Sequence, residues 1–593
     1  MKEFKTESKK ILDMMINSVY TNKDIFLREL ISNSSDALDK LEFESLTDKK
    51  LKYDKKDLAI HINVDRDKRL LTISDNGIGM DKDELDKNLG VVARSGTLDY
   101  KEKLDKKSDL IGMFGVGFYS AFMVAEKIEV ISKKRGSKAY KWTSHGLKGY
   151  DIKESDAKED GTKVILTIKK DEEFNYDKYL DDNNLKNLIV KYSNHIRYPI
   201  YLNDKEEHIN EMVPIWKKAK KSIKEEEYAS FYKERFRRFD DPELVIHGKA
   251  EGRYEFDYLL YIPSKMPVDF YSKDYDLGLA LYARGVMIMD RCKDLLPDYL
   301  GFIKGVVDSK DLKLNISREF LQEDRAIAAI KNTIETKVLK ELKKLQEEDT
   351  EKYKKFFTNF GLSLKFGAYN NFGMDKDKLK DLLMFYASSE ADLIALRDYD
   401  KDAKGIYYVA GENFKQALSH PKAQKMIDEG KNILVLTDPV DEFVIKVLGS
   451  YDDKPFINVA SSKNEDESEE IKQANEKASS LLEKMQNYIK EDVSEVKFSS
   501  SLGDFPVALS SKGELSIEME KVLSQMPGAG SAISDKVLLI NKDHPIAKKL
   551  EKAKDDELKD ITKALYAGAA FQEGLPVDDI ADINNIIFKY MAK

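Results

Sequence analysis

Apolar and polar residues alternate along several stretches of the first part of the chain. A period of two is typical of a strand with one buried face, and it predicts strands at residues 58–64, 71–73, 128–130 and 164–168. Apolar residues at helical spacing instead predict helix over residues 11–40, with a break near 21–24, and again near 184–196. Strands mixed with long helices favour a layered α/β unit over residues 1–210.

Two further units follow from the same pattern. Residues 211–472 contain a long helical stretch at 324–346 and strand signals at 258–262, 286–289 and 433–436. The acidic run at residues 461–470 is typical of a linker, and residues 473–593 are mostly helical in pattern. A chain of 593 residues has room for roughly three to five domains. We therefore expect an α/β multidomain protein with a mostly helical C-terminal domain.

Composition limits the kinds of partner that the protein can bind and the compartment that it suits. The formal net charge is −9, which gives no general attraction to nucleic acid or to an anionic membrane. Cys292 is the only cysteine, so no intrachain disulfide can form, and this suits a reducing cytoplasm. The first residues lack the apolar core of a signal peptide, and no apolar run approaches the roughly 18 residues of a membrane span. The histidines show no zinc-ligand spacing.

The most informative motif, Asp75-Asn76-Gly77-Ile78-Gly79, ends one predicted strand. The period of two puts Asp75 on the same inward face as Leu71 and Ile73. A carboxylate on a buried face is costly unless something hydrogen-bonds to it, and the two glycines let the backbone turn tightly and a flat ligand approach. An ordinary turn after a half-buried strand is the alternative interpretation.

A second candidate pair, Glu29 and Asn33, lies in a predicted helix. A spacing of four places the two side chains on one face, one turn apart. A carboxylate can act as a general base toward water, and an amide oxygen suits a Mg²⁺ whose charge phosphates already neutralise. Asp36 and Lys40 continue this polar stripe. Alone, such a pair is more typical of a solvated helix face.

Two further glycine elements complete the set of candidates. Gly112, Gly115 and Gly117 precede an apolar stretch at residues 119–124 that can start a helix, and backbone N–H groups at such a start bind phosphate well. The element is neither a Walker A loop nor a dinucleotide fingerprint. Thr162 follows Gly161 in phase with a predicted strand, so its hydroxyl could meet Asp75 or a base edge, or only cap the strand.

In this order the elements resemble the Bergerat ATP-binding fold of type II topoisomerases, mismatch-repair ATPases, histidine kinases and one chaperone family. The amino acids of these motifs are far more similar to those of the chaperone family, the heat-shock protein 90 family. The resemblance is almost letter for letter at residues 26–37, 111–120, 305–309 with 314–319, and 437–442. It spans all three expected units.

The resemblance implies a role for each motif. Asp75 would accept the adenine amino group, with Gly79 and Thr162 beside it, and Asn33 would bridge Mg²⁺ and the phosphates of ATP. Glu29 would orient and deprotonate the attacking water. Residues 90–117 match a mobile lid. The remaining nucleotide-binding residues would be Asp36, Met80, Asn88, Arg94, Gly115, Val116, Gly117 and Phe118.

One implied catalytic residue lies far along the chain. Arg318 matches the middle-domain arginine that reaches the γ-phosphate, a role akin to an arginine finger supplied in cis. The alternative is a surface salt bridge to Glu319 or Asp311. The intact motif around Arg318 favours the catalytic role.

Of the three expected units, the C-terminal one resembles the family least in sequence. An apolar stripe there would belong to a homodimeric helical bundle by analogy, or equally to an intramolecular core. A second amphipathic helix matches a region that contacts clients, although core packing would give the same pattern. The stripe is Ile580, Ile583, Ile587 and Tyr590, and the client-binding candidates are Leu515, Met519, Val522 and Leu523.

Two absences indicate the bacterial type of the family. The sequence given ends at Lys593 without the acidic tail that recruits tetratricopeptide co-chaperones, and no long charged linker separates the first two units. We therefore expect a cytoplasmic protein that works with unfolded clients and a bacterial co-chaperone system, without tetratricopeptide partners.

Three functions compete at this point. The leading one is an ATP-driven chaperone that opens and closes as a homodimeric clamp. A DNA-processing ATPase with the same nucleotide fold would need a strand-passing tyrosine domain or a basic DNA saddle, and the acidic chain signals neither. A nucleotide-binding scaffold without turnover would require Glu29 or Arg318 to be misplaced.

Overall fold

The structure is a computed structural model. It describes residues 22–47, 53–91, 115–146, 149–171, 174–203, 205–272, 275, 277–312, 324–462, 468–526 and 532–592. The chain divides into two compact units, residues 1–297 with 301–337, and residues 298–300 with 338–593. Several predictions lie outside the described residues: helix before residue 22, residues 92–114 of the lid, Arg94, Arg318 and part of the acidic linker.

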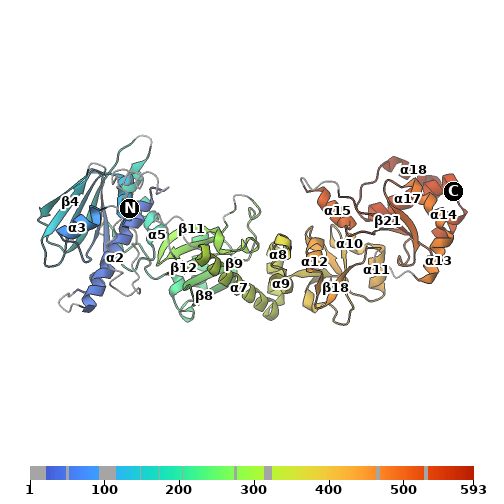
Figure 1. The fold of residues 1–593 in the computed structure, drawn as a ribbon, viewed down its shortest axis with the longest axis horizontal. Helices are drawn as coiled ribbons and strands as arrows, with labels where there is room; N and C mark the ends of the chain where they lie inside the picture. Colours follow the sequence, from blue (N-terminus) through green and yellow to red (C-terminus); the bar gives the residue numbers. More distant parts are fainter. Residues whose placement is uncertain are drawn as a thin grey trace, which may run out of the picture. The chain divides into compact units, whose positions relative to one another are not determined.

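The first unit begins with a seven-stranded sheet in the order β5-β4-β3-β6-β2-β1-β7. Helix α2 (Ile25–Thr47) lies across this sheet and packs on β2 and β1 (Figure 1). Buried and partly exposed residues alternate along β1 and β2, as the period of two predicts. The strands are β1 (Ile60–Asp65), β2 (Leu70–Asp75), β3 (Ala125–Lys133), β4 (Ala139–Ser144), β5 (Tyr150–Ser155), β6 (Gly161–Ile168) and β7 (Ile200–Leu202).

Helices around this sheet agree with the prediction at one place and differ at another. Helix α5 (Asp182–Ser193) lies where helix is predicted, and α3 (Lys82–Leu89) begins with a capping box of Asp81 and Glu84. The apolar stretch after Gly117 forms only the short 3₁₀ helix η3 (Gly117–Met123). It stops there because the chain passes at once into β3, which pairs with β6.

A second sheet follows in the same unit, in the order β11-β10-β12-β9-β8, with helix α6 (Glu225–Phe236) beside it. One cluster of buried apolar residues includes members of both sheets, such as Ile60, Leu259 and Val306. The strands are β8 (Pro242–Ala250), β9 (Phe256–Pro263), β10 (Leu279–Ala283), β11 (Val286–Cys292) and β12 (Lys304–Ser309).

Most of the second unit follows Val338, within helix α7 (Asp324–Glu348), and it contains a six-stranded sheet in the order β14-β13-β16-β15-β18-β17. Helix α7 confirms the predicted helical stretch, and α8 (Thr350–Gly373) follows it. The sheet carries α10 (Phe414–Leu418), α11 (Pro421–Asp428) and α12 (Asp441–Leu448). Its strands are β13 (Met384–Ala387), β14 (Asp392–Ala395), β15 (Ile406–Ala410), β16 (Leu434–Leu436), β17 (Ser450–Tyr451) and β18 (Lys454–Asn458).

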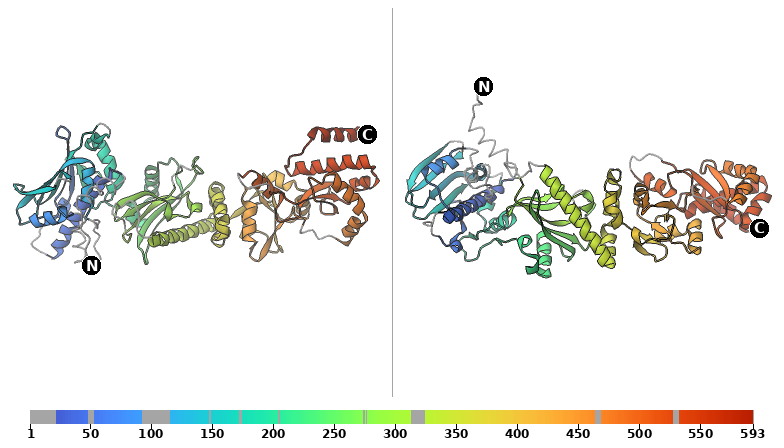
Figure 2. Two further views of the ribbon diagram at one scale, coloured as in Figure 1. Left: turned by 45° about the horizontal axis from the view of Figure 1, so that its top comes forward. Right: turned by 60° about the horizontal axis from the view of Figure 1, so that its bottom comes forward.

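The C-terminal part contains a three-stranded sheet, β19-β21-β20, that the sequence pattern does not predict. Every residue of β20 and β21 is buried, so these strands show no alternation. Helices α14 and α17 pack on the sheet, and α18 lies beside α17 (Figure 2). The elements are β19 (Glu495–Ser499), β20 (Val507–Ser511), β21 (Lys536–Asn541), α13 (Glu469–Lys477), α14 (Ser479–Tyr488), α15 (Ile517–Ser524), α16 (Pro545–Lys552), α17 (Asp555–Gln572) and α18 (Ile580–Met591).

Helix α18 divides the predicted apolar stripe between two faces. Ile583 is buried together with Ile586, whereas Ile580 is 52% exposed and Ile587 is 39% exposed. Phe588 joins the exposed face. Among the helices that the structure describes, none combines the length and apolar character needed to cross a bilayer.

Candidate nucleotide site

Asp75 lies at the end of β2 and is paired with Thr162 of β6. Its carboxylate accepts hydrogen bonds from the backbone N–H of Gly77, at 3.0 Å, from the hydroxyl of Ser34 and from the backbone of Thr162. Burial raises the pKa of Asp75 to about 7, and these three hydrogen bonds oppose that rise. The predicted inward carboxylate is therefore present, held by α2 on one side and by β6 on the other.

The turn after Asp75 is pressed against its neighbours, and this explains its glycines. Gly79 has φ +66°, and a Cβ there would lie 2.1 Å from the carbonyl oxygen of Lys133. A Cβ on Gly77 would lie 2.7 Å from the backbone of Ala37, whose carbonyl accepts a hydrogen bond from Ile78 N–H. Only glycine permits this close approach. The turn is thereby attached to both α2 and β3.

Helix α2 carries the predicted acid and amide on one continuous helix. Glu29 is only 2% exposed, while Asn33, one turn later, is exposed. A Cβ on Gly117 would lie 2.4 Å from Oε2 of Glu29, so the glycine-rich turn closes directly over this carboxylate. Asp36 is buried another turn along. The helix thus places a buried carboxylate against the glycine-rich turn and an amide at the solvent side.

A contact that sequence reasoning missed holds Glu29. The Nη2 and Nε atoms of the buried Arg28 donate to Oε1 of Glu29, at 3.0 and 3.2 Å. Nη1 of Arg28 also donates to the carbonyl oxygen of Met287 in β11, at 3.4 Å. Adjacent residues on a helix do not normally face each other, so no spacing rule indicates this pair. Arg28 therefore links the candidate general base to the second sheet.

Thr162, Met80 and Asn88 meet through a serine that the sequence analysis did not select. The hydroxyl of Ser132 in β3 donates to the carbonyl of Gly161, at 3.1 Å, and accepts from the N–H of Met80, at 2.8 Å. It also hydrogen-bonds to the Thr162 hydroxyl, at 2.9 Å. The Asn88 amide points to the Met80 sulfur, at 3.7 Å. Thr162 therefore reaches Asp75 with its backbone, while its hydroxyl fixes the loop around Met80.

Three predicted residues lie together around Gly117. Val116 and Phe118 are buried, and Gly115 has φ +64°. The Phe118 ring packs edge-on against Trp142, with centroids 5.5 Å apart. The ring is thus part of the core, and its backbone is what Phe118 can offer a ligand.

The described part of this site has no carboxylate-rich metal centre. Within the described ranges, no group of three or more His, Cys, Asp or Glu side chains is arranged to hold a metal ion. The candidate ligand on α2 is instead the neutral amide of Asn33, exposed one turn from Glu29. Such a donor fits a Mg²⁺ that phosphate oxygens largely coordinate.

Comparisons with known proteins agree with this geometry. Residues 20–172 match the family described as Histidine kinase-, DNA gyrase B-, and HSP90-like ATPase, and residues 202–593 match the family described as Hsp90 protein. The chain is 46% identical to Chaperone protein HtpG of Clostridium perfringens, over 100% of this chain and 99% of that relative. It is 45% identical to Chaperone protein HtpG of Clostridium botulinum and of Bacillus subtilis, with the same coverage.

Fold and site together define an ATPase of the kind shared by histidine kinases, DNA gyrase B and Hsp90. Because the match extends over the remaining two thirds of the chain, the DNA-processing alternative loses its basis. The chain belongs to the heat-shock protein 90 family, and it is an ATP-dependent molecular chaperone.

Proposed function

We propose that the chain works as a homodimeric clamp in which ATP binding and hydrolysis drive closure around partly folded client proteins. The observation that carries the proposal is the buried Glu29 carboxylate lying against Gly117, on the helix that also holds Asp75 through Ser34. The three domains of this clamp would be residues 1–210, 211–472 and 473–593.

Adenine recognition is assigned to Asp75. A carboxylate at the end of β2, with glycines that bring backbone close on both sides, suits a flat base with an exocyclic amino group. Gly79, Met80, Asn88 and Thr162 would form the surrounding wall, supported by the hydrogen bonds through Ser132. The Asp75 carboxylate would then act as the charged acceptor for the amino group.

Hydrolysis is assigned to Glu29 and Arg318. Glu29 would take the proton of the attacking water, and Asn33 would hold Mg²⁺, which neutralises phosphate charge when bound. Asp36, Arg94 and the turn at Gly115, Val116, Gly117 and Phe118 would complete the phosphate side. The Arg318 guanidinium would stabilise the charge that develops on the phosphoryl oxygens.

Dimerisation is assigned to the C-terminal domain. The outer face of α18 exposes Ile580, Ile587, Phe588 and Met591, with Phe588 66% exposed. Contiguous exposed apolar side chains of this kind mark association surfaces. A second copy would cover this face, while Ile583 stays in the protomer's own core.

Client binding is assigned to the region of α15. Met519 and Val522 line a cavity of about 210 Å³ together with Leu436, Pro439 and Glu442. Met519 is only 6% exposed, so Leu515, Val522 and Leu523, which are partly exposed, would make the first contact with a client. We further propose a cytoplasmic location and a bacterial co-chaperone system as partner.

Arg318→Ala in the full-length protein tests the clamp most directly. If closure delivers Arg318 to the γ-phosphate, the variant keeps ATP affinity and loses turnover, because the guanidinium stabilises charge absent from the resting site. Steady-state ATPase activity, measured with unfolded protein or with DNA, and calorimetric ATP binding are the measurements. Turnover near the wild-type rate in the variant contradicts the arginine assignment.

Removal of residues 473–593 tests the dimer. The truncated chain should sediment as a monomer with reduced ATPase activity, because the two nucleotide domains are no longer held at a high effective concentration. A truncated chain that stays dimeric, or hydrolyses ATP at the full rate, contradicts the clamp mechanism. That result would not contradict the assignment of the ATP site.

A further inference from the structure

The cavity beside α15 lies at the part of the six-stranded sheet where α/β proteins bind ligands. Strands β15 and β16 are parallel neighbours, and the residues that follow them line this cavity of about 210 Å³. The chain passes from β15 to β16 on one side, and then to β17 and β18 on the other side of β15. Such a reversal of direction leaves a crevice at the carboxyl ends of the strands, and ligands bind in this crevice.

The helix that begins at this crevice does not suit an anion. Helix α12 begins at Asp441, and both Asp441 and Glu442 lie in its first turn. Oδ2 of Asp441 accepts hydrogen bonds from the N–H groups of Thr437 and Asp438, at 3.2 and 3.0 Å. The backbone donors before α12 are therefore already bound by a carboxylate of the chain itself. A phosphate or carboxylate ligand would meet like charges there.

Acidic side chains outnumber basic ones in the wall of the cavity. The single lining lysine, Lys521, is shared by two lining acids. Its Nζ atom lies 2.5 Å from Oε2 of Glu518 and 3.6 Å from Oε1 of Glu412. It also donates to the carbonyl oxygen of Glu573, at 2.9 Å. One ammonium group thus serves two carboxylates on this side of the cavity.

The opposite side of the cavity repeats this arrangement. Asp438 lines the cavity, and its Oδ2 lies 2.8 Å from Nζ of Lys365, a buried lysine of α8. The same Nζ atom lies 2.7 Å from Oδ1 of the buried Asp441. Among the residues that the structure describes here, two lysines therefore serve four carboxylates. The charge balance at the cavity is negative even when every ion pair is counted.

Glu442 forms part of the wall and contributes little to this balance. It is only 4% exposed, and it accepts hydrogen bonds from the hydroxyl of Ser516 and from the amide of Asn458, at 3.2 Å for the amide. A further cation on α12, Lys446, attracts Glu442, although its Nζ donates to the carbonyl of Glu514. The negative excess therefore comes from the more exposed acids.

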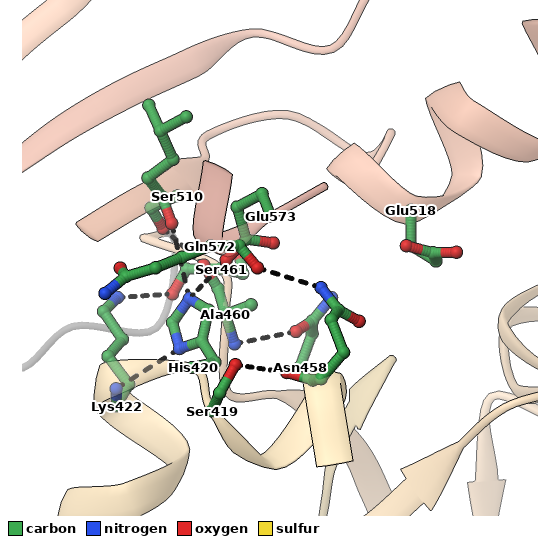
Figure 3. Close-up of polar contacts among 12 residues, drawn as sticks. Ser419, His420, Lys422, Asn458, Ala460, Ser461, Ser510, Glu518, Gln572 and Glu573 are labelled. Carbon is green, nitrogen blue, oxygen red and sulfur yellow. Dashed lines mark hydrogen bonds and ion pairs between the residues drawn. The ribbon is translucent and has the colours of Figure 1, made fainter. Parts of the chain in front are cut away.

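The remaining wall is apolar, and it suits the stem of a long side chain. Leu436 and Pro439 line the sheet side, and Met519 and Val522 line the α15 side. Glu518 projects from α15 toward the six-stranded sheet (Figure 3). Long basic side chains pack their methylene groups on apolar surface and keep the charged head among polar groups. A guanidinium group also presents a planar fork that matches carboxylate oxygens.

We propose that this cavity binds an arginine side chain of an unfolded client segment, with apolar neighbours of that arginine contacting α15. The inference rests on the proposed role of α15 in client binding, and it adds the chemical class of segment that the site selects. The cavity volume lies below the roughly 300–1,000 Å³ of sites for drug-sized ligands, so it suits a single side chain. The guanidinium would lie between Glu412 and Glu518, and its stem would lie between Leu436 and Met519.

Two labelled peptides that differ in one side chain test the selection. The first is a short apolar peptide with a central arginine, and in the second citrulline replaces that arginine, which keeps its shape without its charge. Binding to the full-length protein is measured by fluorescence anisotropy at constant ionic strength. The arginine peptide should bind roughly threefold tighter, as a partly exposed ion pair permits. Equal affinities overturn the inference and leave the client assignment intact, whereas no binding of either peptide contradicts both.

A matched pair of variants separates the cavity from the general negative charge of the chain. Glu518→Gln should remove most of the preference for arginine and leave the citrulline peptide nearly unaffected. The variant does not leave Lys521 without partners, because Glu412 and the carbonyl of Glu573 remain. Glu483→Gln makes the same charge change on exposed α14 and should keep the preference. An equal preference for arginine in the two variants overturns the proposal.

A signal from the cavity wall locates the bound peptide. In protein labelled with carbon-13 at its methionine methyl groups, the resonance of Met519 is assigned by Met519→Leu. This resonance should shift when the arginine peptide is added, because Met519 lines the cavity on the α15 side. Saturable binding of the peptide without a shift of the Met519 resonance would place the arginine elsewhere and would overturn the proposal.

Discussion

The nucleotide site and the junction between the two sheets of the second unit both bury carboxyl groups, yet they use them differently. Burial raises the pKa of Asp75 at the first place, and of Glu442 and Glu573 at the second, to about 7 in each case. Asp75 takes its hydrogen bonds from the turn, helix and strand around it. Glu442 and Glu573 instead contact groups on the opposite side of the junction.

The partners at the junction show this second use. Glu442 of α12 accepts a hydrogen bond from the hydroxyl of Ser516 across the junction, and another from the amide of Asn458 on its own side. Glu573 lies 3.7 Å from the ring nitrogen of His420, which follows α10. These carboxyl groups join segments distant in sequence. A buried acid with a raised pKa therefore does not by itself mark a ligand site.

Crowding by backbone distinguishes the turn after Asp75 from the junction. A Cβ on Gly79 would lie 2.1 Å from the Lys133 carbonyl oxygen, and one on Gly77 would lie 2.7 Å from the Ala37 backbone. At the junction, a Cβ on Gly411 would meet first the Gln416 side chain, at 2.1 Å, and Gly574, beside Glu573, has φ +69° with its nearest atom at 3.2 Å. The turn after Asp75 therefore needs glycine because other backbone lies against it.

Glu29→Gln should produce the largest effect. A general base contributes about 10²–10⁴-fold to rate, so turnover should fall at least a hundredfold while calorimetric ATP affinity stays near the wild-type value. Glutamine keeps the shape of the side chain and an oxygen that can accept a hydrogen bond from the buried Arg28, while it removes the negative charge of the ion pair. If turnover stays within a few-fold of wild type, Glu29 is a structural partner of Arg28 and the site resembles the junction after all.

Gly79→Ala tests the crowding argument against Gly136→Ala. Both glycines lie in the first unit at positive φ, +66° and +77°, but only Gly79 has backbone within reach of a Cβ. We expect Gly136→Ala to cost roughly 1–2 kcal/mol from left-handed strain alone. Gly79→Ala should cost roughly 2–5 kcal/mol, because overpacking is added.

Tryptophan fluorescence during urea unfolding measures this difference, since the chain's two tryptophans, Trp142 and Trp216, both lie in the first unit. Equal losses of stability in the two variants would contradict the role of close approach at Gly79.

Asp75→Asn should lower ATP affinity at least tenfold, because a hydrogen bond to a charged group contributes about 1.5–3 kcal/mol. Asp65→Asn, at the end of β1 in the same sheet, makes the same charge change away from the motif and should leave affinity unchanged. Calorimetry on both folded variants is the measurement. Near-normal affinity in Asp75→Asn would remove the adenine assignment and leave Asp75 as a structural acid.

Period and spacing predicted where the candidate residues lie, because these residues stand in short motifs on regular elements. Asp75 and the glycines after it follow one strand, and Glu29 and Asn33 share one helix. Their individual roles came from the family resemblance and stay predictions. Arg28 to Met287 and Met80 to Ser132 join residues 259 and 52 positions apart. Contacts of that kind depend on how the sheets pack, which local patterns do not contain.

The junction was missed for a related reason. Strands β20 and β21 are buried on both faces, so they show no alternation. Glu573 lies in no motif, and the matched segment 437–442 that contains Glu442 did not indicate a buried acid at a junction. The apolar stripe of α18 was predicted, but its division between core and surface depends on α17, which packs against it. Family resemblance, rather than periodicity, supplied the roles of Arg318 and of the lid.

The smallest expected effect is on the pH dependence of stability, and it tests the buried carboxyl groups of the junction selectively. The folded pKa values of Glu442 and Glu573, about 7, exceed the ordinary value of 4.5 because of burial. The stability they contribute is therefore complete below pH 4.5 and is lost as the pH rises through 7. Burial lowers the pKa of His420 to about 4, so this group acts in the opposite direction between pH 4 and 6.5.

Above pH 6.5 the carboxyl groups act alone among these three. Between pH 6.5 and 8, the ionisation of each carboxyl group should lower the free energy of unfolding by less than about 1 kcal/mol. Glu573→Gln should roughly halve this loss in urea unfolding followed by far-ultraviolet circular dichroism, and leave tryptophan fluorescence of the first unit unchanged. Glu483→Gln, an exposed glutamate on α14, serves as the control. An unchanged pH slope in Glu573→Gln would mean that Glu573 ionises freely in the folded chain, and that the junction does not depend on its neutral form.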